Sequence, residues 1–182
     1  MITSVIIKDP RLDAARIRKR TTNSVNSNKV FQRVQNIIDD VARSGDRAIF
    51  DYTKKLDGVE LKSLLISSNE IEDAYANVST KQVRSIRLIK DRLTRSETTV
   101  LKHFFKEIKT SSNGITINRA VRPLRSVGCY IPGGKARYPS TAIMCIVPAK
   151  VAKVKRIVAI SPPLKDGSID PLTLVAADIC GV

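Results

Sequence analysis

The segment "VGCYIPGGKARYPSTAIMCIVPAKVAKVKRIVAISPP", residues 127–163, differs in composition from the rest of the chain and decides the fold. Its first apolar run ends at a Pro-Gly-Gly turn, a helix-like apolar stretch follows, and a second apolar run ends at two prolines. A short apolar run that stops at a proline is typical of a strand, and a proline near the start of an apolar stretch is typical of the first turn of a helix. The segment is therefore predicted to form a strand, a turn, a helix and a second strand.

The helix is expected over "PSTAIMCIVPAKVAKV", capped by Ser140 or Thr141, with a kink or a break at Pro148. After the second strand, "RIVAIS", turn residues lead into another helix that stops at Gly181. This order predicts the α/β class and the start of a doubly wound, incomplete nucleotide-binding (Rossmann-like) domain. In such sheets ligands bind beyond the carboxyl ends of the strands.

That edge would run from Tyr130 to Gly134 and be followed by a helix N-terminus, whose free N–H groups favour an anion. No carboxylate occurs from Ile108 to Lys165, so a pyrophosphate would meet no repulsion there. The G-x-G-x-x-G fingerprint is absent, and no acidic residue follows about twenty positions on. The spacing indicates a nucleotide half-site, and glycines that serve only chain geometry are the open alternative.

The first half of the chain is predicted to be helical. Helices are expected over 29–44 and 46–57, after Ser67, and from Ser79 onward as one long helix or two broken near Arg95. We expect residues 1–120 to be the mainly helical N-terminal portion, with a linker at "TSSNG", 110–114. Residues 121–182 would be the first β-α-β-α of a dinucleotide-binding domain, cut short.

The charge raises the question of a polyanionic partner. The formal net charge is +15, and the carboxylate-free third of the chain holds eleven of the cations. Nucleic acid bound by counterion release, or a non-catalytic dimerisation module, are the alternative functions. Only two aromatic residues, Tyr130 and Tyr138, lie in that segment to stack on bases, which argues against nucleic acid. No apolar run has the ~18 residues of a membrane span, and a cytoplasmic location is expected.

Metal-ligating residues are sparse. The three cysteines lie far apart without a C-x-x-C, and the one histidine, His103, has no second histidine or cysteine near it in sequence. We expect His103 to be a packing or solvent-edge residue, and we assign no metal site and no catalytic residue to this chain.

The same central segment, read from Val121, resembles the part of histidinol dehydrogenases in which Val-Gly-x-Tyr-Val/Ile-Pro-Gly-Gly precedes Tyr-Pro-Ser-Thr and Pro-Ala-Lys-Val-Ala. "SGDRAIFDYTKKLDG" and "LVAADICGV" are similar to further parts of that family. The resemblance spans roughly residues 37–182 and concerns the N-terminal part of the family's sequence.

The resemblance implies an α/β, zinc-dependent homodimer that oxidises L-histidinol to L-histidine with NAD, in the last steps of histidine biosynthesis. It implies that Tyr130 contacts NAD and that Pro132, Gly133 and Gly134 form the turn beneath the cofactor. The family's zinc ligands and its Glu-His acid–base pair lie downstream of the similar segment. This chain also departs from the family at Lys153, where Gly is common. By itself the chain is therefore expected to be an inactive N-terminal fragment.

Overall fold

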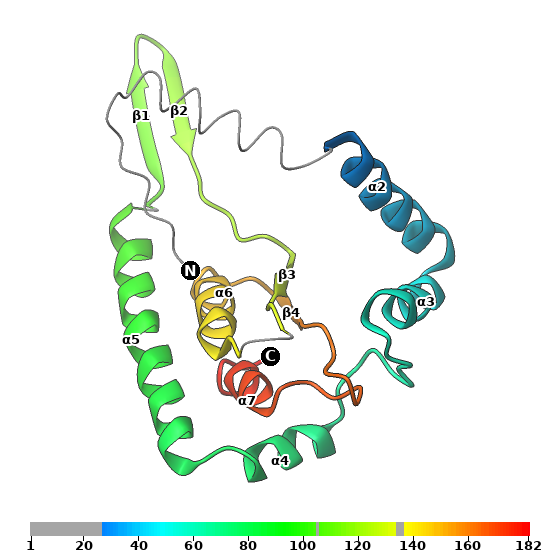
Figure 1. Cartoon of the computed structure of the whole chain (residues 1–182). Coiled ribbons are helices and arrows are strands. Elements are labelled where there is room, and N and C mark those ends of the chain that lie inside the picture. Colours follow the sequence, from blue (N-terminus) through cyan, green and yellow to red (C-terminus); the bar gives the residue numbers. More distant parts are fainter. Residues whose placement is uncertain (1–26, 105, 134–136) are drawn as a thin grey trace, which may run out of the picture. The chain divides into compact units, whose positions relative to one another are not determined.

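The computed structural model describes residues 27–104, 106–133 and 137–182. By its internal contacts the chain divides into two compact units, residues 1–52 and 53–182. The described residues form six helices and two separate two-stranded sheets (Figure 1). This confirms the predicted α/β class.

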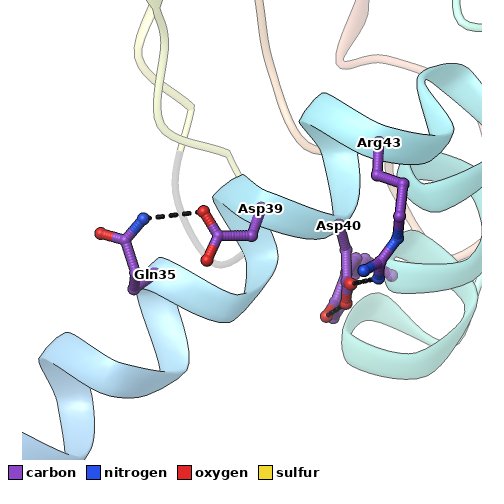
Figure 2. A network of polar contacts seen from close by, with 5 residues as sticks. Gln35, Asp39, Asp40 and Arg43 are labelled. Carbon is purple, nitrogen blue, oxygen red and sulfur yellow. Dashed lines mark hydrogen bonds and ion pairs between the residues drawn. The ribbon is translucent and has the colours of Figure 1, made fainter.

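The first unit contains helix α2, Ser27–Ser44, and the first part of helix α3, Asp46–Asp57. Gly45 separates the two helices with a positive φ of 59°, a conformation that glycine adopts without a steric penalty. Polar contacts one turn apart stabilise α2 itself (Figure 2): Gln35 Nε2 donates to Asp39 Oδ1 at 2.9 Å, and Asp40 accepts from Arg43. The predicted helices over 29–44 and 46–57 are confirmed.

Helix α4, Ser68–Ala76, is the first described helix that lies wholly in the second unit, and it begins with a complete capping box. The Glu70 backbone N–H donates to Ser67 Oγ at 3.3 Å, and the Glu70 carboxylate accepts from the Ser67 N–H at 2.8 Å. The Ser67 N–H, and after it the Ser67 hydroxyl at 2.8 Å, donate to this carboxylate and lower the pKa of Glu70. Helix α5, Thr80–Phe104, begins with the same arrangement at Ser79, whose backbone N–H donates to Gln82 Oε1 at 3.0 Å. It runs as one continuous helix, without a break near Arg95.

Strands β1, Ile108–Ser112, and β2, Ile115–Arg119, form an antiparallel hairpin. The linker prediction at 110–114 is wrong, because these residues form most of β1 and the turn. Asn113 and Gly114 have φ values of 50° and 78°, and two consecutive positive φ angles are the signature of a type I′ hairpin turn.

The predicted strand, helix, strand and helix are all present. Strand β3, Ser126–Tyr130, pairs in parallel with β4, Arg156–Ile160, through helix α6, Pro139–Val151, and helix α7, Pro171–Ile179, follows. Pro148 lies inside α6 and does not end it. The connection is thus a β-α-β unit.

The core of the second unit lies between β3 and helices α4 to α7. Its largest fully buried side chains are Ile131, Ile143, Ile146, Val147 and Val175. Ala74 and Ile86, from α4 and α5, belong to the same cluster. The core therefore takes side chains from both sides of position 120, and the domain boundary there stays a prediction.

Candidate functional site

The carboxyl ends of the two parallel strands lie side by side. Tyr130 pairs with Ile160 in the register, and the Ile131 backbone N–H extends the ladder by donating to the Ile160 carbonyl at 2.8 Å. Ile131 is 1% exposed and anchors the chain at the point where the β3 loop begins. The loops that follow β3 and β4 therefore leave the sheet together, at the edge where parallel α/β sheets bind ligands.

Three of the four predicted cofactor residues can be placed at this edge. Tyr130 ends β3 with its side chain 64% exposed, and Pro132 is half-buried. Gly133 is exposed, and a Cβ added there would lie 3.0 Å from Pro162 Cγ and 3.3 Å from the Pro162 carbonyl oxygen. The absence of a side chain thus lets the two loops approach each other closely. Gly134 lies outside the described residues.

The N-terminus of α6 follows the same loop in the sequence. Its N-cap residue is Tyr138, which makes no side-chain hydrogen bond to the helix, and Pro139 occupies the first turn. The prediction that Ser140 or Thr141 caps this helix is wrong, because both lie inside the helix. An N-terminus without a side-chain cap keeps backbone N–H groups available to an anion.

An ion pair ties this helix start to α7. Arg137 Nε lies 3.2 Å from Asp170 Oδ1, and the Asp170 side chain is only 14% exposed. The other carboxylate oxygen, Oδ2, caps α7 by accepting from the Thr173 backbone N–H at 2.9 Å and the Thr173 hydroxyl at 3.0 Å. Asp170 therefore caps α7 and also contacts a residue just before the start of α6. We did not predict this contact, although an Asp-Pro pair before an apolar run is an N-terminus signal.

The described part of the chain offers no metal centre. Within residues 27–104, 106–133 and 137–182, no group of three His, Cys, Asp or Glu side chains could hold a metal ion. His103 is exposed, and its Nδ1 lies 2.8 Å from the Thr99 carbonyl oxygen of its own helix, as expected for a solvent-edge histidine. Burial raises the pKa of the Cys180 thiol to about 11 and also raises that of Cys129, which disfavours the thiolate that binds zinc. These residues do not fit a zinc site.

The described helices include none long and apolar enough to cross a membrane. The fold defines a class: an α/β protein in which two parallel strands, connected through α6, end at the same edge of their sheet.

Comparison with known proteins gives the family. Residues 19–182 match the family model of histidinol dehydrogenase, and the chain belongs to that family. It is 39% identical over 186 residues to the histidinol dehydrogenase of Methanocaldococcus jannaschii, which covers all of this chain and 43% of the relative. The identity to the Clostridium acetobutylicum enzyme is 38%, over 97% of this chain and 41% of that protein.

The structure is similar to the crystal structure of histidinol dehydrogenase from Elizabethkingia anophelis, with a TM-score of 0.77 and 30% sequence identity. That match covers 84% of this chain and 35% of the other. The chain thus spans less than half the length of the relatives it matches.

Proposed function

We propose that this chain is the NAD-binding N-terminal part of a histidinol dehydrogenase, the enzyme that oxidises L-histidinol to L-histidine. The observation that carries the proposal is the family match over residues 19–182, which includes the whole carboxyl edge of β3 and β4. We further propose that residues 121–182 begin a doubly wound dinucleotide-binding domain and that residues 1–120 belong to a helical portion. The enzyme would work in the cytoplasm as a homodimer.

NAD would accept a hydride from the substrate in each of the two oxidation steps. The Tyr130 ring, exposed at the end of β3, would lie against the cofactor while its hydroxyl makes one polar contact. Pro132, Gly133 and Gly134 would form the turn beneath the cofactor. Gly133 lies so close to Pro162 that a Cβ there would force a shift, and this contact fixes the course of the turn.

The zinc ligands and the acid–base residues would lie outside this chain. The described residues hold no cluster that could bind the metal, so we propose that its ligands and the Glu-His pair lie in the part of the relatives that this chain does not match. The chain by itself would then bind cofactor at most and would not turn over substrate, because a hydride acceptor site alone supplies neither a Lewis acid nor a base.

The test compares this chain with a completed chimera, in which the chain is continued by the unmatched part of the M. jannaschii relative. NADH formation is followed by absorbance with L-histidinol, NAD and zinc. We expect no turnover above background from the chain alone and histidinol-dependent NADH from the chimera. Zinc-dependent turnover by the pure chain would refute the proposed inactivity. A folded chimera that binds NAD and never forms NADH would refute the proposed reaction.

A further inference from the structure

Four cations gather at the amino ends of the two parallel strands, at the sheet edge opposite the one proposed for NAD. We call them the amino-edge cluster: Arg125, Lys153, Lys155 and Arg156. The Arg156 backbone N–H donates to the Arg125 carbonyl at 3.2 Å, which brings the two arginines together on neighbouring strands. Strand β3 separates the cluster from Tyr130 by about 13 Å, at the rise of ~3.3 Å per residue in parallel strands.

The charges of the amino-edge cluster are not neutralised within the described part of the chain. All four residues are exposed, and no ion pair among the described residues involves any of them. They lie in the carboxylate-free segment from Ile108 to Lys165, so no neighbour in the sequence supplies a negative charge. Helix α6 ends just before the cluster, but a helix dipole places only about half a negative charge at its C-terminus.

Lys153 adds its charge in an unfavourable backbone conformation. Its φ is 60°, and its N–H donates to the Lys150 carbonyl at 3.0 Å. The Val154 N–H donates to the Ala149 carbonyl, also at 3.0 Å. These two hydrogen bonds form the Schellman motif that ends α6, and glycine is the usual residue at the position of Lys153. A lysine there strains the backbone and adds repulsion to a group of like charges, which a bound anion would offset.

We propose that the amino-edge cluster is a binding surface for a chain of phosphates, which it holds through charge. Arg125 and Arg156 come from neighbouring strands, about 4.8 Å apart, and each guanidinium can donate two parallel hydrogen bonds to a phosphate. A ligand with a single phosphate would meet only part of the cluster, whereas a chain offers one charge to each cation. The inference depends neither on the proposed NAD site nor on the proposed reaction.

The cluster has no means to recognise bases. None of its four residues is aromatic, and the two aromatic residues of the carboxylate-free segment lie away from it: Tyr130 ends β3, and Tyr138 precedes the first turn of α6. Bases bound in single strands stack on aromatic side chains. The ligand is therefore defined by its phosphates alone, which inorganic polyphosphate and a nucleic-acid backbone both provide.

The experiment measures the binding of two probes to the 182-residue chain. A fluorescein-labelled single-stranded oligothymidylate of about 16 nucleotides, the upper range of single-strand site sizes, is titrated by fluorescence anisotropy. Unlabelled inorganic polyphosphate of similar length is titrated by calorimetry and used as the competitor. The edge variant is Arg125→Gln with Arg156→Gln. The matched control is Lys81→Gln with Arg84→Gln on α5, which removes the same charge from two exposed residues without a described ion pair.

We expect the edge variant to weaken oligothymidylate binding at least about tenfold, and the control variant to change it less than about twofold. The logarithm of the affinity should fall with the logarithm of the salt concentration with a slope of about 3, and of about 1.5 in the edge variant, because each phosphate contact in a single strand contributes about 0.7. Equal losses in both variants would overturn the proposal, because the net charge of +15 would then attract the probe without a site. Binding of neither probe at low salt is equally a refutation.

Lys153→Gly separates binding from stability. It relieves the strained φ and removes one charge, so the melting temperature should rise by roughly 2–4 °C. The affinity for either probe should fall about threefold or more at 0.1 M salt. A stabilised variant does not lose affinity through unfolding. A higher melting temperature with unchanged affinity would contradict the proposal, because the strained lysine would then serve no ligand.

Competition distinguishes the two sources of phosphate. Displacement of oligothymidylate by polyphosphate at equal phosphate concentration supports recognition of the phosphate chain itself, and binding of polyphosphate without oligothymidylate identifies the inorganic polymer. If polyphosphate fails to displace bound oligothymidylate, bases are recognised and the proposal is wrong. The completed chimera should bind with the same dependence on the edge residues, and loss of binding there would refute the proposal for the whole enzyme. None of these measurements reads NADH, so failure here is separate from failure of the proposed reaction.

Discussion

Substitutions at Asp170 separate two interactions, because its two carboxylate oxygens make different contacts. Oδ2 caps α7 through Thr173, and Oδ1 pairs with Arg137 across 33 residues of sequence. Asp170→Asn keeps an oxygen that can cap the helix and removes the charge. Asp170→Ala removes both functions and leaves the Thr173 hydroxyl, in a residue that is only 4% exposed, without its acceptor.

The magnitudes follow from those contacts. Loss of an N-cap side chain costs about 0.5–2 kcal/mol, and a buried hydroxyl without its partner adds about 1–3 kcal/mol. The ion pair contributes less, about 0–1 kcal/mol, because the Arg137 side chain is 68% exposed. We therefore expect Asp170→Ala to lower the free energy of unfolding by about 2–3 kcal/mol, and Asp170→Asn by no more than about 1 kcal/mol.

The assay is urea unfolding at low micromolar protein, followed by far-ultraviolet circular dichroism. With an m value of about 2 kcal/mol/M, Asp170→Ala should move the midpoint down by about 1 M and Asp170→Asn by less than half of that. Arg137→Gln removes only the ion pair and serves as its control. It should lower the urea midpoint by the same amount as Asp170→Asn. If the Asn and Ala variants unfold at the same urea concentration, the capping argument is refuted, and the ion pair is the dominant contact.

Three further outcomes are expected. Gly133→Ala should lower the melting temperature, because its Cβ would lie 3.0 Å from a proline ring, whereas Gly128→Ala, with only a flexible side-chain atom at 3.4 Å, should be tolerated; equal losses would contradict this. Burial, and then the hydrogen bond to a carboxylate, raise the pKa of Tyr75 to about 12, so its contribution to stability is full below pH 10 and is lost as the pH rises toward 12. In melts recorded at several pH values, Tyr75→Phe should reduce the fall in melting temperature between pH 10 and 12. If the melting temperature of the variant falls as steeply as that of the parent, the role assigned to Tyr75 is wrong. Iodoacetamide at pH 8 should label the half-buried Cys145 before Cys180, whose pKa burial raises to about 11, and mass spectrometry of the peptides would reveal the opposite order.

Local signals in the sequence predict most of the elements. The two strands are visible as apolar runs that end at prolines, and the Ser67–Glu70 spacing predicts a capping box that the structure confirms. The hairpin was missed although Asn113-Gly114 is a strong turn signal, because both strands are exposed along their whole length and β1 has only one apolar residue, Ile108. A strand without a buried face gives periodicity little to detect.

Contacts between distant residues could not be predicted. The pairing of Arg137 with Asp170 depends on how α6 and α7 pack, which no spacing rule contains. Pro148 illustrates the same limit, because its effect depends on its surroundings. The proline removes the hydrogen bond to the Met144 carbonyl, and Met144 is 65% exposed, so water can reach this side of α6 and replace the lost donor.

The central claim, that the end of β3 binds the cofactor, is tested most directly by titrating NAD into the completed chimera and its Tyr130→Ala variant by calorimetry. Loss of the ring contact and one hydrogen bond should cost roughly 1–3 kcal/mol, which raises the NAD dissociation constant about ten- to a hundredfold. The histidinol constant should change little, and so should the melting temperature, because Tyr130 is 64% exposed. An unchanged NAD constant together with a lowered melting temperature would contradict the account and make Tyr130 a packing residue.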